Sequence, residues 1–157
     1  MNKTISIKNV APIKVLTTCG QINFINLEEE AHLLYDEAKE ASYKSIINLV
    51  YNNTLSSNIK SECIIRPCFP IRNAFFDIDK SRYIFDVLPR TSVVSIMHKG
   101  DYDDLDKVFL ELTEYITANN LQTKLPLRVI HQEKIKKSFF KKYSKCYITE
   151  IQVPIEE

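Results

Sequence analysis

The sequence predicts an α+β fold in which two long helices pack on a mainly antiparallel sheet. Two observations carry this prediction: a strand-turn-helix run at residues 92–120, and the order strand, helix, strand, strand, which occurs twice. A chain of 157 residues is long enough to bury the core of one domain. We therefore expect a single domain over residues 1–157, with unit one at about 1–89 and unit two at about 90–157.

The run that supports the prediction best opens unit two. Its apolar residues predict a strand over 92–98, and Gly100 then provides a turn. A helix over 101–119 follows, because apolar side chains recur on one helical face: Leu105, Val108, Phe109, Leu112 and Ile116. Asn119 and Asn120 tolerate the left-handed conformation that ends many helices.

Unit one opens with extended structure over residues 5–18, interrupted by Pro12. A long helix is predicted to begin at Asn26, and its core-facing stripe continues as far as Leu49. Short apolar strands are then predicted at residues 63–65, 74–78 and 83–88. The last two flank a polar segment that is typical of a hairpin turn.

Unit two ends with predicted strands at 126–132 and 145–153. The connection between them, residues 133–145, holds six lysines and three aromatic residues. Such a mixture can bind single-stranded nucleic acid, but a solvated loop explains it equally simply. The near-neutral charge of the chain makes a dedicated nucleic-acid binder the less favoured interpretation.

The charge balance and the apolar runs bound the class of protein. A net charge of +1 offers no field for nucleic acid or an anionic membrane. No apolar run approaches the roughly 18 residues that span a bilayer, and the N-terminus lacks the apolar core of a signal peptide. We expect no membrane partner and a cytoplasmic location.

No conventional catalytic signature is present. The chain has no Gly-x-Ser-x-Gly elbow, no glycine-rich phosphate loop and no His-Glu-x-x-His helix. The four cysteines, at positions 19, 63, 68 and 146, are expected to be reduced thiols rather than disulfides or zinc ligands. We therefore predict no catalytic residue, no metal and no cofactor.

Two short motifs carry a resemblance to a known family. An apolar strand runs into His-x-Gly-x-Tyr at residues 98–102, and the chain closes with Thr-Glu-Ile-Gln-Val-Pro at residues 149–154. In this order and separation they resemble the gyrase-inhibitor-like effector-binding domains, which sense ligands in bacterial drug-responsive transcription regulators and also occur alone. The resemblance implies two units related by a pseudo-two-fold axis, with a ligand groove where they meet.

The resemblance also points to a departure. The family's strand after the second helix carries a buried glutamate that attracts cationic drugs, with a tyrosine two residues later. Arg128 falls where that glutamate would be, and Ile130 where the tyrosine would be. A buried arginine repels cations and favours carboxylate or phosphate groups, so the multidrug-cation interpretation does not carry over. The alternative is that Arg128 pairs internally with Asp86 or Glu150.

Aromatic residues complete the predicted binding site. The resemblance puts Tyr147 and Tyr35 at wall positions of the groove, and Tyr83 and Phe85 could add to the wall from unit one. Ordinary core packing is the alternative for each of them. By strand alternation Glu150 faces away from Tyr147, so we expect it to be structural or interfacial.

These observations favour a stand-alone domain that binds a small aromatic or amphipathic molecule, resembling the sensing half of a regulator. Because the chain starts directly in the first strand, no helix-turn-helix fits upstream, and any effect on transcription would need a protein partner or sequestration of a ligand. One rival is a hydrolase of strained-ring genotoxic natural products, which needs a positioned general acid or base. The other is an interaction module that inhibits an enzyme such as gyrase through an exposed complementary patch.

Overall fold

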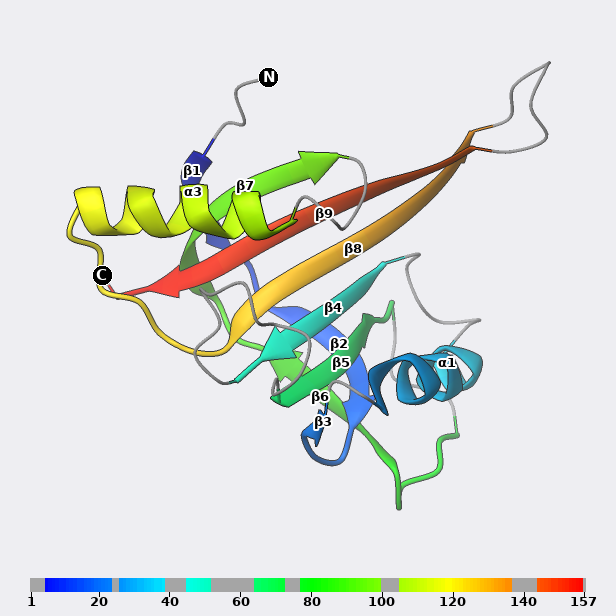
Figure 1. The fold of residues 1–157 in the computed structure, drawn as a ribbon. Coiled ribbons are helices and arrows are strands. Elements are labelled where there is room, and N and C mark those ends of the chain that lie inside the picture. Colours follow the sequence, from blue (N-terminus) through cyan, green and yellow to red (C-terminus); the bar gives the residue numbers. More distant parts are fainter. Residues whose placement is uncertain are drawn as a thin grey trace.

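The computed structural model describes residues 5–23, 26–38, 45–51, 64–72, 77–99, 105–136 and 144–156. These residues form one antiparallel sheet and two helices, which confirms the predicted α+β class (Figure 1). Within these ranges, neither helix has the length and apolar character that crossing a membrane requires.

The strands of the sheet come from both halves of the chain. The first half supplies β1 (Ile5–Val10), β2 (Ile13–Thr18), β3 (Ile22–Asn23), α1 (Leu27–Ala38), β4 (Ile46–Val50), β5 (Ile64–Pro70) and β6 (Tyr83–Leu88). The second supplies β7 (Thr91–Lys99), α3 (Leu105–Ala118), β8 (Leu127–Lys136) and β9 (Ser144–Ile155). Across the sheet the order is β1-β7-β9-β8-β4-β5-β2-β6, and β3 pairs with β5 beside this path.

The strands are arranged in the same pattern when the sheet is followed inward from either edge. One half of the sheet is β6-β2-β5-β4 and the other is β1-β7-β9-β8, and the halves meet where β4 pairs with β8. A valine faces a proline at the matching place of each half: Val15 with Pro70, and Val93 with Pro154. The register therefore relates the two halves by a pseudo-two-fold axis between β4 and β8.

The axis matches residues of the two central strands. Ile47 of β4 lies opposite Ile130 of β8, and Leu49 lies opposite Arg128. A two-fold rotation between antiparallel strands exchanges these two pairs without changing the face on which a side chain lies. Ile47 in the first half therefore corresponds to Arg128 in the second, and Leu49 corresponds to Ile130.

Both helices cover the same face of the sheet. On α3 the described part of the predicted apolar stripe, from Val108 to Ile116, packs against β7, β8 and β9, with Leu112 fully buried. On α1, Leu34 packs with Leu16 of β2 and Phe69 of β5. Asn120 ends the second helix with a φ of 53°, the left-handed conformation expected from the sequence.

Two short links force the sheet to curl. Only residues 11–12 separate β1 from β2, and only residues 89–90 separate β6 from β7. Yet β1 and β2 belong to opposite halves of the sheet, as do β6 and β7. Since three Cα steps span roughly 11 Å at most, each link draws the two halves together at one end of the sheet (Figure 1).

The curl buries the sheet face that the helices do not cover. Val15, Ile47, Leu49, Cys68 and Leu88 form a cluster on this face, and none is more than 5% exposed. All five residues of this described cluster come from strands of the sheet. The inside of the curl is therefore a second interior, distinct from the two cores under the helices.

The first helix is shorter than predicted. The apolar stripe indicated a helix reaching Leu49, but α1 ends at Ala38 and residues 46–50 form strand β4. This segment is rich in β-branched residues and pairs with β5 on one side and β8 on the other. The prediction was wrong because central sheet pairing overrides a helical periodicity that a short apolar run satisfies by chance.

Strand β5 also runs further than predicted, because Pro67 does not end it. On one side β5 pairs with β3 at residues 64–65 and with β2 at residues 68–70. Pro67 falls in the gap between these two partners, where a missing N–H leaves no ladder bond unmade. Its carbonyl accepts a hydrogen bond from the Thr17 hydroxyl at 2.8 Å.

The predicted hairpin around residues 79–82 is only partly within the described residues. Its second arm is β6, and its turn is held by the Asp79 carboxylate, which accepts bonds from the backbone and hydroxyl of Ser81. Most of the first arm lies outside the described residues, and residues 77–78 are not in a strand. The described partner of β6 is β2.

Candidate functional site

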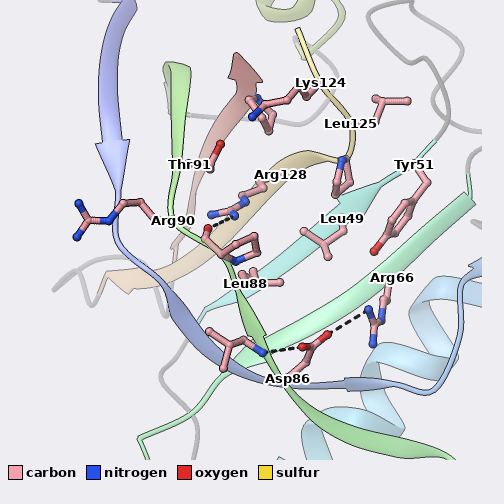
Figure 2. Close-up of a pocket in the computed structure, with 14 residues that line it drawn as sticks. Leu49, Tyr51, Arg66, Asp86, Leu88, Arg90, Thr91, Lys124, Leu125 and Arg128 are labelled. Atoms are coloured by element: carbon pink, nitrogen blue, oxygen red, sulfur yellow. Dashed lines mark hydrogen bonds and ion pairs between the residues drawn. The ribbon is translucent and has the colours of Figure 1, made fainter. Parts of the chain in front are cut away.

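A cavity of about 290 Å³ lies inside the curl, between the central strands and the β6–β7 link (Figure 2). Its lining is mostly apolar, with prolines and leucines from several elements around a few charged groups. The lining residues are Leu49, Tyr51, Arg66, Asp86, Val87, Leu88, Pro89, Arg90, Thr91, Lys124, Leu125, Pro126, Arg128 and Pro154. An apolar cavity with a small number of placed polar groups is the usual form of a small-molecule site.

Arg128 is the polar residue buried most deeply in this lining. It is 3% exposed, and its Nη2 donates a hydrogen bond to the Pro89 carbonyl at 3.0 Å. Its Nη1 is buried and makes no hydrogen bond within the described part of the chain. Burial lowers the pKa of the Arg128 guanidinium, but an arginine still keeps its charge at neutral pH. The wall of the pocket therefore holds a buried positive charge.

The internal pairing considered for Arg128 is not what the structure shows. Asp86 pairs with Arg66, with 3.4 Å between its Oδ2 and Nη1, and accepts a hydrogen bond from the Val87 amide at 2.7 Å. Both interactions are drawn in Figure 2. Glu150 is engaged by Ser95, Gln152 and Lys8. Among the described residues, Arg128 has no ion-pair partner.

Glu150 is the centre of a separate network. Its Oε2 accepts hydrogen bonds from Ser95 at 2.6 Å and Gln152 at 2.8 Å, and it pairs with Lys8 at 2.6 Å. Burial acts to raise the pKa of the Glu150 carboxyl, but the bonds from Lys8, Ser95 and Gln152 outweigh it, so the pKa lies below its usual value. This agrees with the structural role expected for Glu150.

The mouth of the pocket adds further positive charge. Arg90 and Lys124 are exposed lining residues, and Figure 2 shows Arg90 extending away from the cavity. Asp86 is the single acidic residue in the described lining, and it pairs with Arg66. The net field inside the pocket is positive, and it comes from Arg128.

The six residues predicted to bind ligand do not converge. Arg128 and Ile130 lie together inside the curl, where Ile130 packs against the interior cluster. Tyr83 and Phe85 lie on the opposite, helix-covered face, in the core beneath α1. The core-packing alternative therefore describes where these two aromatics lie.

Tyr35 does not line the pocket either. Tyr35 is 46% exposed on α1, and its ring lies 5.7 Å from that of Phe69 on the helix-covered face. The backbone of Tyr147 pairs with Glu133 near the start of β9. The Tyr147 side chain lies outside the described residues.

Sequence reasoning missed the first-half lining of the pocket. Arg66 shares a face with Cys68, and this could have been found had the strand been continued through Pro67. Burial raises the pKa of the Cys68 thiol to about 11, so it stays neutral beside Thr17. No sequence signal indicates Lys124 or the Pro89 carbonyl, because only the curl brings these connections over the central strands.

The described residues hold no group of three or more potential metal ligands. The described pocket can hold a small molecule by apolar contact and by one buried positive charge.

Comparisons with known proteins agree with this architecture. No family model and no curated protein sequence matches the chain. Among solved structures, the C-terminal domain of EcmrR aligns over 100% of this chain and 99% of its own, with a TM-score of 0.71 and 18% identity. The EcmrR chain of an EcmrR–DNA complex aligns over 99% of this chain and 58% of its own length.

Two further structures widen the set. A hydrolase from Listeria innocua aligns over 98% of this chain and 92% of its own, with a TM-score of 0.61 and 11% identity. SAV2435 bound to tetraphenylphosphonium aligns over 99% and 94%, with a TM-score of 0.57 and 13% identity. At these identities the likeness establishes the fold. The chain therefore has the gyrase-inhibitor-like effector-binding fold that its two sequence motifs predict.

Proposed function

We propose that this chain is a small-molecule-binding domain of the effector-binding kind, and that its ligand binds inside the curl of the sheet. One observation carries the proposal: a mostly apolar cavity of about 290 Å³ is lined by a buried charged group, Arg128, whose Nη1 has no hydrogen-bond partner among the described residues. A fold gains nothing from such a group unless something else satisfies it. The likeness to the C-terminal domain of EcmrR and to SAV2435 bound to tetraphenylphosphonium supports a ligand-sensing role.

Regulation of transcription would then be indirect. The net charge of +1 provides no broad basic surface for DNA. We propose that ligand binding is passed to a DNA-binding partner, or that the domain withdraws the ligand from solution.

Hydrolysis is the weaker alternative, although one structural neighbour is a hydrolase. A hydrolase needs a general acid or base in reach of its substrate. In the described lining, Asp86 is the only acid, and it is held by Arg66 and the Val87 amide. A binding function needs no such group.

Thermal shift tests the proposal directly. Purified protein is screened against aromatic anions, aromatic cations and neutral planar compounds, because a ligand that binds only the folded state raises the melting temperature. Leu125→Asn removes an exposed leucine from the pocket mouth, and Leu110→Asn removes one from α3 as a matched control. We expect at least one compound class to stabilise the protein, with a smaller shift in Leu125→Asn and an unchanged shift in Leu110→Asn. No stabilisation by any class would reject the proposal and direct attention to protein partners.

A further inference from the structure

The chemistry of the ligand can be inferred from the way Arg128 is left in the structure. Arg128 is 3% exposed, and within the described part of the chain its Nη2 donates a hydrogen bond to the Pro89 carbonyl. Its Nη1 is also buried and has no hydrogen-bond partner among the described residues. A planar guanidinium with such a donor is suited to a carboxylate oxygen.

The charge balance of the pocket limits the ligand to one negative charge. Arg66 and Asp86 neutralise each other at the edge of the cavity, 3.4 Å apart. Arg90 and Lys124 are exposed and solvated, so their charges are screened by water. Arg128 alone remains buried and uncompensated, and one anionic group balances it. A phosphate dianion would bring a surplus negative charge into the same low-dielectric space.

The remaining lining sets the body of the ligand. Leu49, Leu88, Pro126 and Pro154 provide apolar walls, and Tyr51 adds a ring. Rings bury large area with little loss of rotamer freedom and so suit such walls. The cavity volume of about 290 Å³ accommodates one or two fused rings rather than an extended chain.

From these three observations we infer that the pocket binds a small aromatic monocarboxylate, with its carboxylate against the Arg128 guanidinium and its ring against the apolar walls. The inference rests on the proposed function, since it names the ligand class of the same pocket. It departs from a cation-binding site, because an uncompensated buried arginine repels an approaching cation.

Three isosteric probes separate charge from shape: 2-naphthoate, 2-naphthamide and 2-naphthylmethylammonium, each titrated calorimetrically at pH 7.5. The same ring meets the same walls in all three, so only the group facing Arg128 changes. We expect 2-naphthoate to bind roughly ten- to a hundred-fold more tightly than the amide, the difference typical of a hydrogen bond to a charged group. The ammonium probe should bind most weakly.

Variants assign the preference to one side chain. Arg128→Gln should bring the affinities for naphthoate and naphthamide to within about twofold by weakening the naphthoate alone. Arg128→Lys keeps the charge but loses the planar fork, so its preference should lie between those of wild type and Arg128→Gln. Arg82→Gln removes a partly exposed arginine that pairs with Glu30 outside the pocket, and it should leave all three affinities unchanged.

Two results would overturn the inference while leaving the proposed function in place: equal binding of naphthoate and naphthamide by the wild type, or an unchanged preference in Arg128→Gln. The second would mean that Arg128 is satisfied internally, for example through water to the buried Gln152 Oε1, which lies opposite it in register and has no described hydrogen-bond partner. Failure of all three probes to bind, together with a negative thermal-shift screen, would reject both proposals. Circular dichroism of each variant confirms that the fold is retained.

Discussion

Ile47 and Arg128 occupy matching positions in the two halves of the sheet, yet one is a buried aliphatic residue and the other a buried cation. The first half shows that the fold itself is satisfied by an apolar side chain at this position. The second half therefore carries a charge that the architecture does not require. Placing a charge where a matching aliphatic residue suffices costs stability, and this is the pattern expected of a residue kept for binding.

The two halves also have ion pairs at matching positions, but the positions of the positive and negative residues are exchanged. Arg66 lies opposite Leu49 and Glu150 lies opposite Ile130, so the axis matches Arg66 with Glu150. Asp86 and Lys8 match in the same way, because they lie opposite Val15 and Val93. The second pair is supported by Ser95 and Gln152, and it closes its side of the curl. The first pair edges the cavity. The backbones of the two halves are therefore related by symmetry, whereas the charges at matching positions differ.

The largest expected difference between the halves is in their helical cores. Leu112 of α3 and Leu34 of α1 are both fully buried, but Leu112 belongs to the larger cluster. We expect Leu112→Ala to lower the free energy of unfolding by about 3–5 kcal/mol and Leu34→Ala by about 2–3 kcal/mol. Urea denaturation measures both. A larger loss for Leu34→Ala would show that the first half carries more of the stability.

Replacing Arg128 by an apolar residue should stabilise the ligand-free protein. In Arg128→Met the free energy of unfolding should rise by about 1–3 kcal/mol, because a buried charge without a partner is removed. Arg82→Gln, on the surface, should change it by less than about 0.5 kcal/mol. If denaturation shows that Arg128→Met destabilises the protein, the bond to the Pro89 carbonyl outweighs the desolvation of Arg128.

His131 offers a pH test of the same axis, since it matches Val50. Burial lowers the pKa of His131 from 6.5 to about 4 in the folded chain, so the unfolded chain binds more protons between these values. The contribution of His131 to the free energy of unfolding is therefore fully present near pH 7.5, and the free energy falls by about 2 kcal/mol by pH 5. His131→Val should flatten this part of the denaturation profile. An unchanged slope in His131→Val would place the titrating group elsewhere.

The smallest expected difference separates the two ion pairs. Glu150→Gln should cost about 1–2 kcal/mol at pH 7, because three donors are arranged around a carboxylate. Asp86→Asn should cost less than about 1 kcal/mol, since the Asp86 side chain is 41% exposed. The pKa of Glu150 is lowered, so its contribution is present above the unfolded value of 4.5 and disappears as the pH falls. Equal losses in the two variants would mean that the network around Glu150 adds nothing.

Local patterns in the sequence were sufficient for the fold and insufficient for the pocket. The strand and helix of residues 91–118 were predictable because apolar spacing and turn residues there agree with the tertiary contacts. β4 was mistaken for the end of a helix, because its partners, β5 and β8, lie far along the chain. A pattern within 15 residues contains no information about such pairing.

The position of Arg128 was predictable and its surroundings were not. Strand alternation placed it on one face with Ile130, and the structure agrees. That Tyr83 and Phe85 lie on the other face follows from the register of β6 with β2, which no local pattern gives. The Pro89 carbonyl and Lys124 reach the pocket only because two short links draw the halves together.

The exchange of edge strands by those links has a consequence for how the chain folds. β1 is synthesised well before its partner, β7, with Ile5 opposite Ile96. The N-terminal strand must therefore wait for residues more than halfway along the chain, and such non-local pairing slows folding. The predicted unit boundary near residue 89 lies between β1 and its partner β7. Pulsed hydrogen exchange during refolding should show the amides of β1 gaining protection together with those of β7, and not with those of β2.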